Sequence, residues 1–169
     1  MFARPFLTAG LACALIAGCT SAQTAPTAAT VKFEPIATAC EGRDGWGDPA
    51  PPAHIYGNVY MVGTCGIVSL LITTPQGHFL IDGAIPEAAT EIAQNIRELG
   101  FDPTDVRYLL NTHKHFDHSG GLAGLKRMTG AKMVARAEAK DALESGDVHP
   151  SDPQKGLFDP VEGVTLDQM

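Results

Sequence analysis

The sequence predicts an α/β fold in which helices cover a mixed β-sheet. Strand-like runs come first along the chain, and helix-like and strand-like segments then alternate. This order is typical of a layered α/β domain. The composition agrees with a globular protein, because 44% of the residues are hydrophobic and 18% are charged. A disordered or collagen-like chain is therefore excluded.

Length and charge limit the class of function further. The chain has 169 residues, which is about one domain. Its formal net charge is −7, from 12 Lys and Arg against 19 Asp and Glu, and it has no basic stripe. Because binding to a phosphate backbone needs clustered Lys or Arg, we expect no nucleic-acid partner. A monomer is expected.

The first residues are typical of a targeting segment. Arg4 precedes an apolar run over 6–17 that is shorter than the roughly 20 residues needed to span a bilayer. Residues 15–19 resemble a bacterial lipobox, which would make residues 1–18 the signal peptide and Cys19 a lipidated N-terminus. Ordinary cleavage after Ala22 is the alternative. Both interpretations export the protein to the periplasm, with membrane anchoring in the first.

A tether and then a folded domain follow the signal segment. Residues 19–39 are rich in Thr, Ala and Pro and are predicted to be a flexible tether, so the domain covers 40–169. Once Cys13 has left with the signal, and with Cys19 as a lipidation site, Cys40 and Cys65 are the remaining thiols. In an oxidising compartment they are candidates for one disulfide, and free buried thiols are the alternative.

The first half of the domain has the pattern of strands. A strand is predicted over 54–62, and Gly63 ends it. Two further strands, 67–73 and 78–82, are joined by a turn at 75–77. Both of these runs are almost continuously apolar, which predicts strands buried on both faces.

Helical spacing begins at Pro86, which suits the first turn of a helix. Gly100 is expected to end this helix. Its apolar positions recur at helical spacing: Ala88, Ile92, Ile96 and Leu99.

In the second half of the domain, strand-like and helix-like segments alternate. The predicted elements are a strand over 106–111, a helix over 120–128 ended by Gly130, a strand over 132–135, and a helix over 137–144 ended by Gly146. A long loop with several prolines follows from His149, and a short strand is expected to begin at Val161.

Potential metal ligands are concentrated where the strand 106–111 stops and the next helix starts. Within six residues the chain has His113, His115, Asp117 and His118. Imidazole and carboxylate groups are ligands that zinc prefers. His113 and His115 are two apart and point the same way on an extended segment, whereas Asp117 and His118 can reach a second point. The spacing therefore predicts two adjacent metal positions, beside which Gly120 and Gly121 allow a tight turn.

Two other interpretations of this segment fit less well. A solvated histidine-rich loop would not need four potential ligands at fixed positions. A purely structural zinc site would favour a closed, cysteine-rich set.

The motif H-x-H-x-D-H, with a strand before it and a helix after it, resembles the metallo-β-lactamase superfamily, whose fold is an αββα sandwich. The match covers most of residues 54–146. Three segments are similar to the third subclass of class B β-lactamases: 55–64, 77–83 and 151–154. The resemblance implies that the chain is the N-terminal half of such a sandwich.

The resemblance also implies a ligand set and an activity. His113 and His115 would hold a first zinc ion, and Asp117 and His118 a second. A hydroxide that bridges the two ions would open the lactam amide and give antibiotic resistance, with Asp117 orienting the nucleophile as the candidate catalytic residue. Gln154 would line the substrate groove.

The positions of Cys40 and Cys65 also resemble those of cysteines in this subclass. Subclass relatives with one cysteine before a Trp-containing segment and another in a Gly-Thr-Cys-Gly stretch resemble this chain, which supports a Cys40–Cys65 pair.

The chain departs from the family pattern downstream of the motif. The family completes the two sites with further histidines, but after His118 this chain has only His149, which we interpret as a surface residue. His54 and His78 are interpreted as structural. We therefore expect a truncated, N-terminal form of a β-lactam hydrolase with little activity of its own. The alternatives are another exported hydrolase of the superfamily, a lactonase or thioesterase, or an inactive zinc-binding fragment.

Overall fold

The structure, a computed structural model, describes residues 34–168. The predicted signal segment 1–18, Cys19 and the first part of the tether lie outside the described residues. The last part of the predicted tether is instead a single helical turn, α1 (Ile36–Ala39), because the Cys40 N–H closes the turn on the Ile36 carbonyl. Within the described part of the chain, no helix has the length and apolar character needed to cross a membrane.

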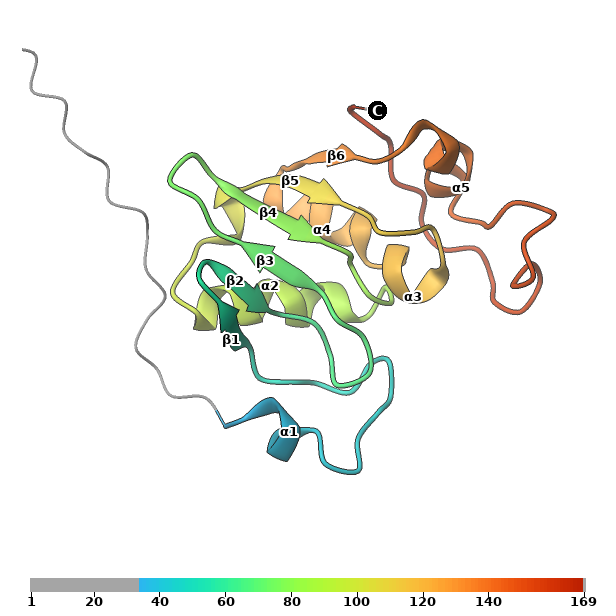
Figure 1. The fold of residues 1–169 in the computed structure, drawn as a ribbon. Helices are drawn as coiled ribbons and strands as arrows, with labels where there is room; N and C mark the ends of the chain where they lie inside the picture. The colour runs from blue at the N-terminus through green and yellow to red at the C-terminus, as the bar shows by residue number, and fades with distance from the viewer. Residues whose placement is uncertain (1–33, 169) are drawn as a thin grey trace, which may run out of the picture.

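The described chain is built on one six-stranded sheet (Figure 1). Its order follows the sequence: β1 (Ala53–Tyr56), β2 (Val59–Met61), β3 (Leu70–Ile72), β4 (His78–Ile81), β5 (Val106–Leu110) and β6 (Lys132–Val134). The strands β1 to β4 pair antiparallel, whereas β4, β5 and β6 pair in parallel. The predicted mixed sheet is therefore confirmed.

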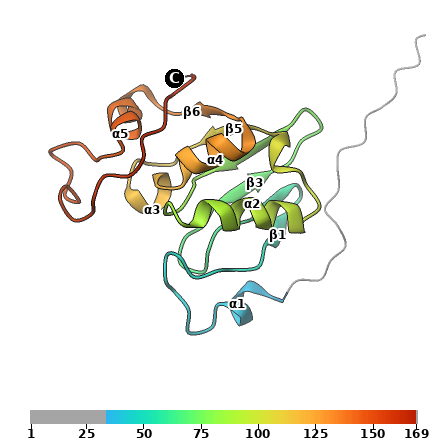
Figure 2. The same cartoon turned by 180° about the vertical axis from the view of Figure 1, so that it is seen from behind.

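Two helices cover one face of this sheet, as the view from behind shows (Figure 2). They are α2 (Ala88–Glu98) and α4 (Leu122–Thr129). The shorter helical elements lie at the ends of strands and in connections: η1 (Pro103–Asp105), α3 (Phe116–Ser119), η2 (Ala137–Ala139) and α5 (Lys140–Ser145).

The hydrophobic core lies between the sheet and these two helices. Leu71, Leu80 and Leu109 point into it from three neighbouring strands and are fully buried. All four apolar positions predicted for the first helix are buried, because the 3.6-residue period places them on one face of α2. Gly100, with φ of +88°, follows α2 as expected of a helix stop.

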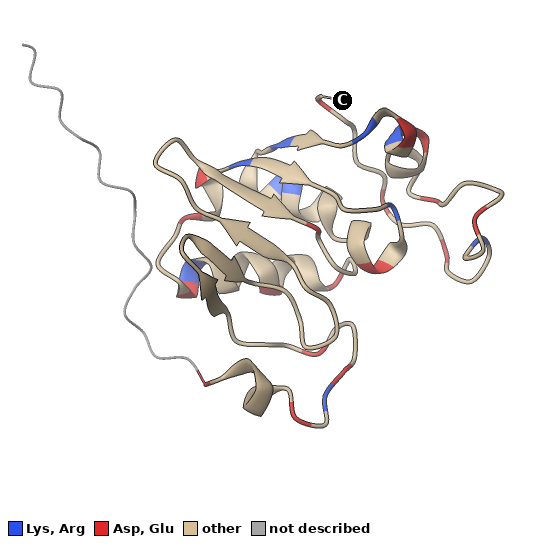
Figure 3. Cartoon of the chain, viewed as in Figure 1, with Lys and Arg blue, Asp and Glu red and all other residues tan. Residues whose placement is uncertain are grey.

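The opposite face of the sheet is apolar but only half-buried. Its side chains alternate with the core positions along the strands: Leu70, Ile72, Phe79, Ile81, Tyr108 and Leu110. No charged residue lies on β1 to β4, and this face is uncharged along them in Figure 3. The prediction that both faces of β3 and β4 are buried was wrong for the described residues, because helices cover only one face.

Three predicted elements differ in their bounds. The single strand predicted over 54–62 is a hairpin, because Gly57, with φ of +56°, and Asn58 form the turn between β1 and β2. This Gly-Asn pair is a hairpin signal that the sequence contained. β3 starts only at Leu70, because Thr64 and Ile67 close a tight turn before it. No strand begins at Val161, and only an isolated bridge joins Gln168 to Val134.

Two predicted helices also differ from the structure in where they start. The helix expected from Gly120 is preceded by α3, so the helical turn starts inside the histidine motif itself. The segment predicted as one helix over 137–144 begins as the 3₁₀ turn η2 and continues as α5. Gly130 and Gly146 end their helices in the left-handed conformation, as predicted.

One polar residue of α2 is unexpectedly buried. Asn95 is 1% exposed, and its Nδ2 donates to the carbonyl of Ala50 at 3.1 Å and to that of Val62 at 3.0 Å. These bonds join α2 to the segment before β1 and to the end of β2. Hydrophobic periodicity alone could not place an asparagine there, because its role is to satisfy two buried carbonyls.

We expect Asn95→Ala to lower the free energy of unfolding by about 2–3 kcal/mol, because buried carbonyl acceptors lose their donor. Urea unfolding followed by circular dichroism measures the change. Gln94→Ala is the matched control, since Gln94 lies exposed on the same helix, and its effect should stay within about 0.5 kcal/mol. Equal losses in the two variants would contradict this role.

Candidate metal centre

The histidine motif lies at the edge of the sheet where β4 and β5 end. Because these two strands are parallel neighbours, their carboxyl ends meet at the same edge. Asp82 directly follows β4, and the loop 111–115 directly follows β5 and leads into α3. Residues about 30 positions apart in the sequence are thereby brought together.

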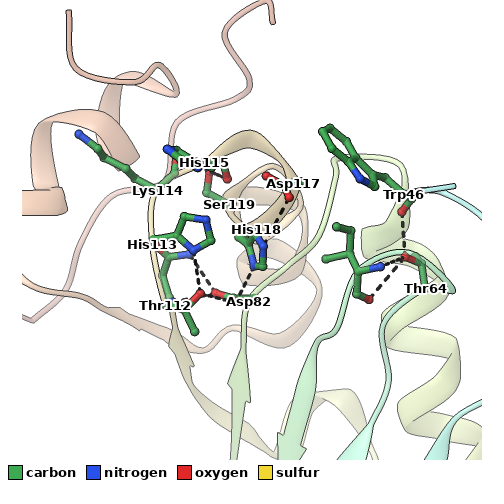
Figure 4. A network of polar contacts seen from close by, with 12 residues as sticks. Trp46, Thr64, Asp82, Thr112, His113, Lys114, His115, Asp117, His118 and Ser119 are labelled. Atoms are coloured by element: carbon green, nitrogen blue, oxygen red, sulfur yellow. Dashed lines mark hydrogen bonds and ion pairs between the residues drawn. The ribbon is translucent and has the colours of Figure 1, made fainter. Parts of the chain in front are cut away.

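Asp82 is the centre of the hydrogen-bond network at this edge. Its side chain is 5% exposed, and its oxygens accept from the Thr112 N–H at 2.8 Å and from the Thr112 hydroxyl at 2.6 Å. Asn111 Nδ2 donates at 3.1 Å, and His118 Nδ1 lies 2.9 Å from Oδ2. Figure 4 shows Asp82 beneath the histidine rings. These donors offset the cost of burying a carboxylate.

The backbone around Asp82 is unusual and closely packed. Asp82 has φ of +63° and Ala84 has φ of +52°, values that residues other than glycine rarely adopt. A Cβ on Gly121 would lie 2.2 Å from the Gly83 carbonyl oxygen, so the start of α4 can approach this turn only because residue 121 is glycine. The tight turn predicted at Gly120 and Gly121 is thus present.

Sequence reasoning gave Asp82 no role. The available signal was a carboxylate placed directly after a buried apolar strand.

Three predicted ligands lie close enough to hold one metal ion. One ligand atom from each of His113, Asp117 and His118 lies within 4.8 Å of the others (Figure 4). The rings of His113 and His118 are 4.2 Å apart, and His118 Nε2 is 3.4 Å from Asp117 Oδ2. This group combines residues that the sequence assigned to two different metal positions, because α3 turns Asp117 and His118 back towards His113.

His115 lies next to this group rather than within it. Its ring is 4.8 Å from that of His113, and its Nε2 is 3.3 Å from Asp152 Oδ2. His115 immediately precedes α3, and its side chain is 30% exposed.

The donors fit a divalent metal of the zinc type. Thr112 Oγ1 is 3.1 Å from His113 Nδ1, and Asp82 contacts His118 Nδ1, so both rings have Nε2 available as a ligand. Burial, and then the nearby rings of His118 and His115, lower the pKa of His113. A lowered pKa favours the neutral imidazole, which is the form that binds a metal.

An aromatic cluster that sequence reasoning did not identify lies beside the centre. Phe116 and Phe158 stack with ring centroids 5.0 Å apart, and Trp46 lies 5.7 Å from Phe158. Trp46 and Phe158 are 38% and 39% exposed. We call these three residues the aromatic wall. It places an apolar surface next to polar metal ligands, an arrangement typical of small-molecule sites.

The segment that carries Trp46 is held by two contacts with the β2–β3 connection. Thr64 Oγ1 donates to the Trp46 carbonyl at 2.8 Å. The structure also joins Cys40 to Cys65 by a disulfide.

The remaining residues singled out in the sequence lie outside the group of three. Gln154 Oε1 is buried without a hydrogen-bond partner, and its side chain lines a cavity of about 20 Å³ together with Lys114 and Phe116. Such a cavity has room for a single water molecule. His149 is exposed, as predicted, and its Nδ1 lies 2.7 Å from Ser151 Oγ.

The other two histidines have structural surroundings. His54 packs on Tyr60, and the buried His78 lies against Phe101.

Comparison with known proteins gives a family match and similar solved structures. The model of the metallo-beta-lactamase superfamily matches residues 62–167. The crystal structure of the metallo-β-lactamase MIM-1 from Novosphingobium pentaromativorans is 51% identical, with a TM-score of 0.76, and the match covers 79% of this chain and 50% of that one. MEM-A1, a subclass B3 metallo-β-lactamase from a soil metagenome library, is 43% identical, with a TM-score of 0.70, over 74% of this chain and 48% of that one.

Curated relatives include other hydrolases. An N-acyl homoserine lactonase of Rhizobium johnstonii is 33% identical over 43% of this chain and 35% of its own length. A hydroxyacylglutathione hydrolase of Methylobacterium nodulans is 40% identical over 37% of this chain and 23% of its own length. The match thus spans about half the length of the solved structures and between 23% and 35% of the length of these relatives.

We expect Asp82→Asn to weaken the binding of added zinc by about 10–100-fold, because an amide has one acceptor oxygen where the carboxylate uses two, so one side of the network loses its acceptor. Competition with a chromophoric chelator measures the affinity, and circular dichroism checks the fold. Asp105→Asn is the control, since that carboxylate is exposed and pairs with Arg107 at another edge. Unchanged zinc affinity in a folded Asp82→Asn protein would argue against this role.

Proposed function

The chain belongs to the metallo-β-lactamase superfamily, and we propose that it acts as a zinc-dependent hydrolase of β-lactams. The observation that carries this proposal is the likeness to solved β-lactamases. It reaches 51% identity over 79% of the chain, whereas the lactonase match is weaker and shorter. The His and Asp cluster supplies imidazole and carboxylate donors of the kind that such a hydrolase uses.

We assign the ligands as the motif suggests. His113 and His115 bind one zinc ion, and Asp117 and His118 bind a second. When bound, zinc supplies a Lewis acid and lowers the pKa of water towards neutrality. Because ligand atoms of His113, Asp117 and His118 lie within 4.8 Å of one another, two ions held in this way would be close neighbours.

The chain's own residues would position the reactants. Asp117 has two carboxylate oxygens, so one can bind metal while the other accepts a hydrogen bond from the attacking water and orients it towards the lactam carbonyl. The aromatic wall offers an apolar surface for the side chain of the β-lactam and excludes water from one side of the site. Gln154 stays a candidate substrate contact on the sequence motif alone.

A second candidate function has specific support. The lactonase and the hydroxyacylglutathione hydrolase among the relatives act, by their names, on an ester and a thioester. The same metal ligands and the same oriented water would serve these substrates. A lactonase or thioesterase activity is therefore the alternative to be tested against β-lactam hydrolysis.

A comparison of three substrates on one zinc-loaded preparation distinguishes these functions. We expect a chromogenic cephalosporin to give the highest kcat/KM, ahead of an acyl homoserine lactone and an acyl thioester. A chelator should abolish the reaction, and Asp117→Ala should lower it about 100-fold or more. Asp105→Ala is the control.

Two other results would contradict the proposal of β-lactam hydrolysis. Faster cleavage of the lactone or thioester would support the second candidate. Stoichiometric zinc binding without cleavage of any of the three substrates would identify the chain as a zinc-binding protein without this hydrolase activity.

We further propose that the protein is exported to the periplasm and anchored there through a lipidated Cys19. The signal-like residues 1–18 and the lipobox-like residues before Cys19 support this proposal. A disulfide between Cys40 and Cys65 fits it, because disulfides persist in oxidising compartments. In the folded protein this bond would hold the segment that leads to Trp46.

Reduction of this disulfide is expected to destabilise the protein. For a sequence separation of 25 residues, the loss of the cross-link should cost about 3.5 kcal/mol. Thermal unfolding with and without a reductant measures the change, and the double variant Cys40→Ser/Cys65→Ser should match the reduced protein. Two free thiols titrated in protein isolated from the periplasm would contradict the pairing.

A further inference from the structure

Two of the three histidine rings of the centre are held through the same nitrogen. His113 Nδ1 contacts Thr112 Oγ1, and His118 Nδ1 contacts Asp82 Oδ2. Both holding residues lie at the ends of the parallel strands β4 and β5. Each ring consequently presents Nε2 to the space between them.

His115 is held in the opposite way. Its Nε2 lies 3.3 Å from Asp152 Oδ2, so its Nδ1 is the nitrogen that remains available. Asp152 is 37 residues further along the chain, in the loop 147–161 that follows α5. The orientation of this one ring therefore depends on a segment outside the sheet.

Asp152 is itself firmly positioned. Its side chain is only 10% exposed, its Oδ1 accepts from the Gln154 N–H at 3.0 Å, and its carbonyl accepts from the Lys155 N–H at 3.0 Å. The bond from Gln154, and then the contact with His115, hold the pKa of Asp152 below its usual value. At neutral pH the group is a carboxylate, which accepts hydrogen bonds and donates none.

A second contact docks the same loop on α3. Phe158 stacks on Phe116, the residue directly after His115, with an interplanar angle of 9°. The loop thus contacts two neighbouring residues at the start of α3. Phe158 stacks on Phe116, and the Asp152 carboxylate contacts His115.

We propose that Asp152 is a positioning residue of the metal centre, which accepts the Nε2–H of His115 and so keeps Nδ1 of that ring free and correctly aimed as a ligand. This inference rests on the proposed zinc-dependent function. An outer carboxylate of this kind fixes the tautomer of a histidine ligand and increases its basicity. Without Asp152 the ring would be free to rotate and to exchange tautomers.

The tautomer of His115 gives a direct test in the metal-free protein. Long-range ¹H–¹⁵N spectra at about pH 8, where an ordinary imidazole is neutral, show which ring nitrogen carries the proton. We expect the Nε2–H form for His115 in the wild-type chain and a mixture of both forms in Asp152→Ala. An Nδ1–H form in the wild-type chain would overturn the proposal.

Zinc affinity gives the second test, measured by competition with a chromophoric chelator. We expect Asp152→Ala to weaken binding by about 10–100-fold. Asp152→Asn should give an affinity between those of the wild-type chain and Asp152→Ala, because its one amide oxygen can accept from Nε2–H only if the Gln154 N–H loses its acceptor. Asp147→Asn is the matched control, since Asp147 is in the same loop and pairs with Lys155 rather than with a histidine.

The outcomes separate this inference from the proposed function. Unchanged affinity in Asp152→Ala, or an equal loss in Asp147→Asn, would overturn the role of Asp152 and leave the hydrolase proposal intact. A wild-type chain that binds no zinc would refute the proposed function, and the tautomer measurement would still decide whether Asp152 fixes His115. If Asp152→Ala does not fold, the zinc affinity of Asp152→Asn and the His115 tautomer in the wild-type chain still test the proposal.

Discussion

The buried carboxylate of Asp82 is the interaction on which the metal centre depends. It lies at the end of β4 and accepts hydrogen bonds from two residues of the neighbouring β5 loop and from the first helical turn after it. No part of this arrangement is local in the sequence. The parallel pairing of β4 with β5 creates it, and the contact of Gly83 with Gly121 fixes the distance between the strand ends and α4.

The sequence predicted the class of the fold and the residues of the motif well, for identifiable physical reasons. Hydrophobic periodicity located α2 and its buried face, and Gly130 and Gly146 marked the ends of α4 and α5. The grouping of the ligands was harder to foresee. His113 and His115 both precede α3, and their rings lie 4.8 Å apart. The spacing alone does not show that α3 also turns Asp117 and His118 back towards His113.

Contacts between distant segments could not be predicted from local patterns. The burial of Asn95 depends on the carbonyls of Ala50 and Val62, and the place of Asp152 depends on how a long loop returns to the motif. The same holds for the uncovered sheet face. Apolar runs such as β3 and β4 show that a strand can be buried on both sides, but they do not show which side a helix reaches.

The position of Trp46 has a practical consequence. It is the one tryptophan of the 169 residues, and its indole lies beside Phe116 and Phe158, close to the histidine motif. The intrinsic ultraviolet fluorescence of the chain therefore comes mainly from one spot, where the N-terminal segment, α3 and the 147–161 loop meet. The protein contains its own optical probe of whether these three segments are assembled, without any added label.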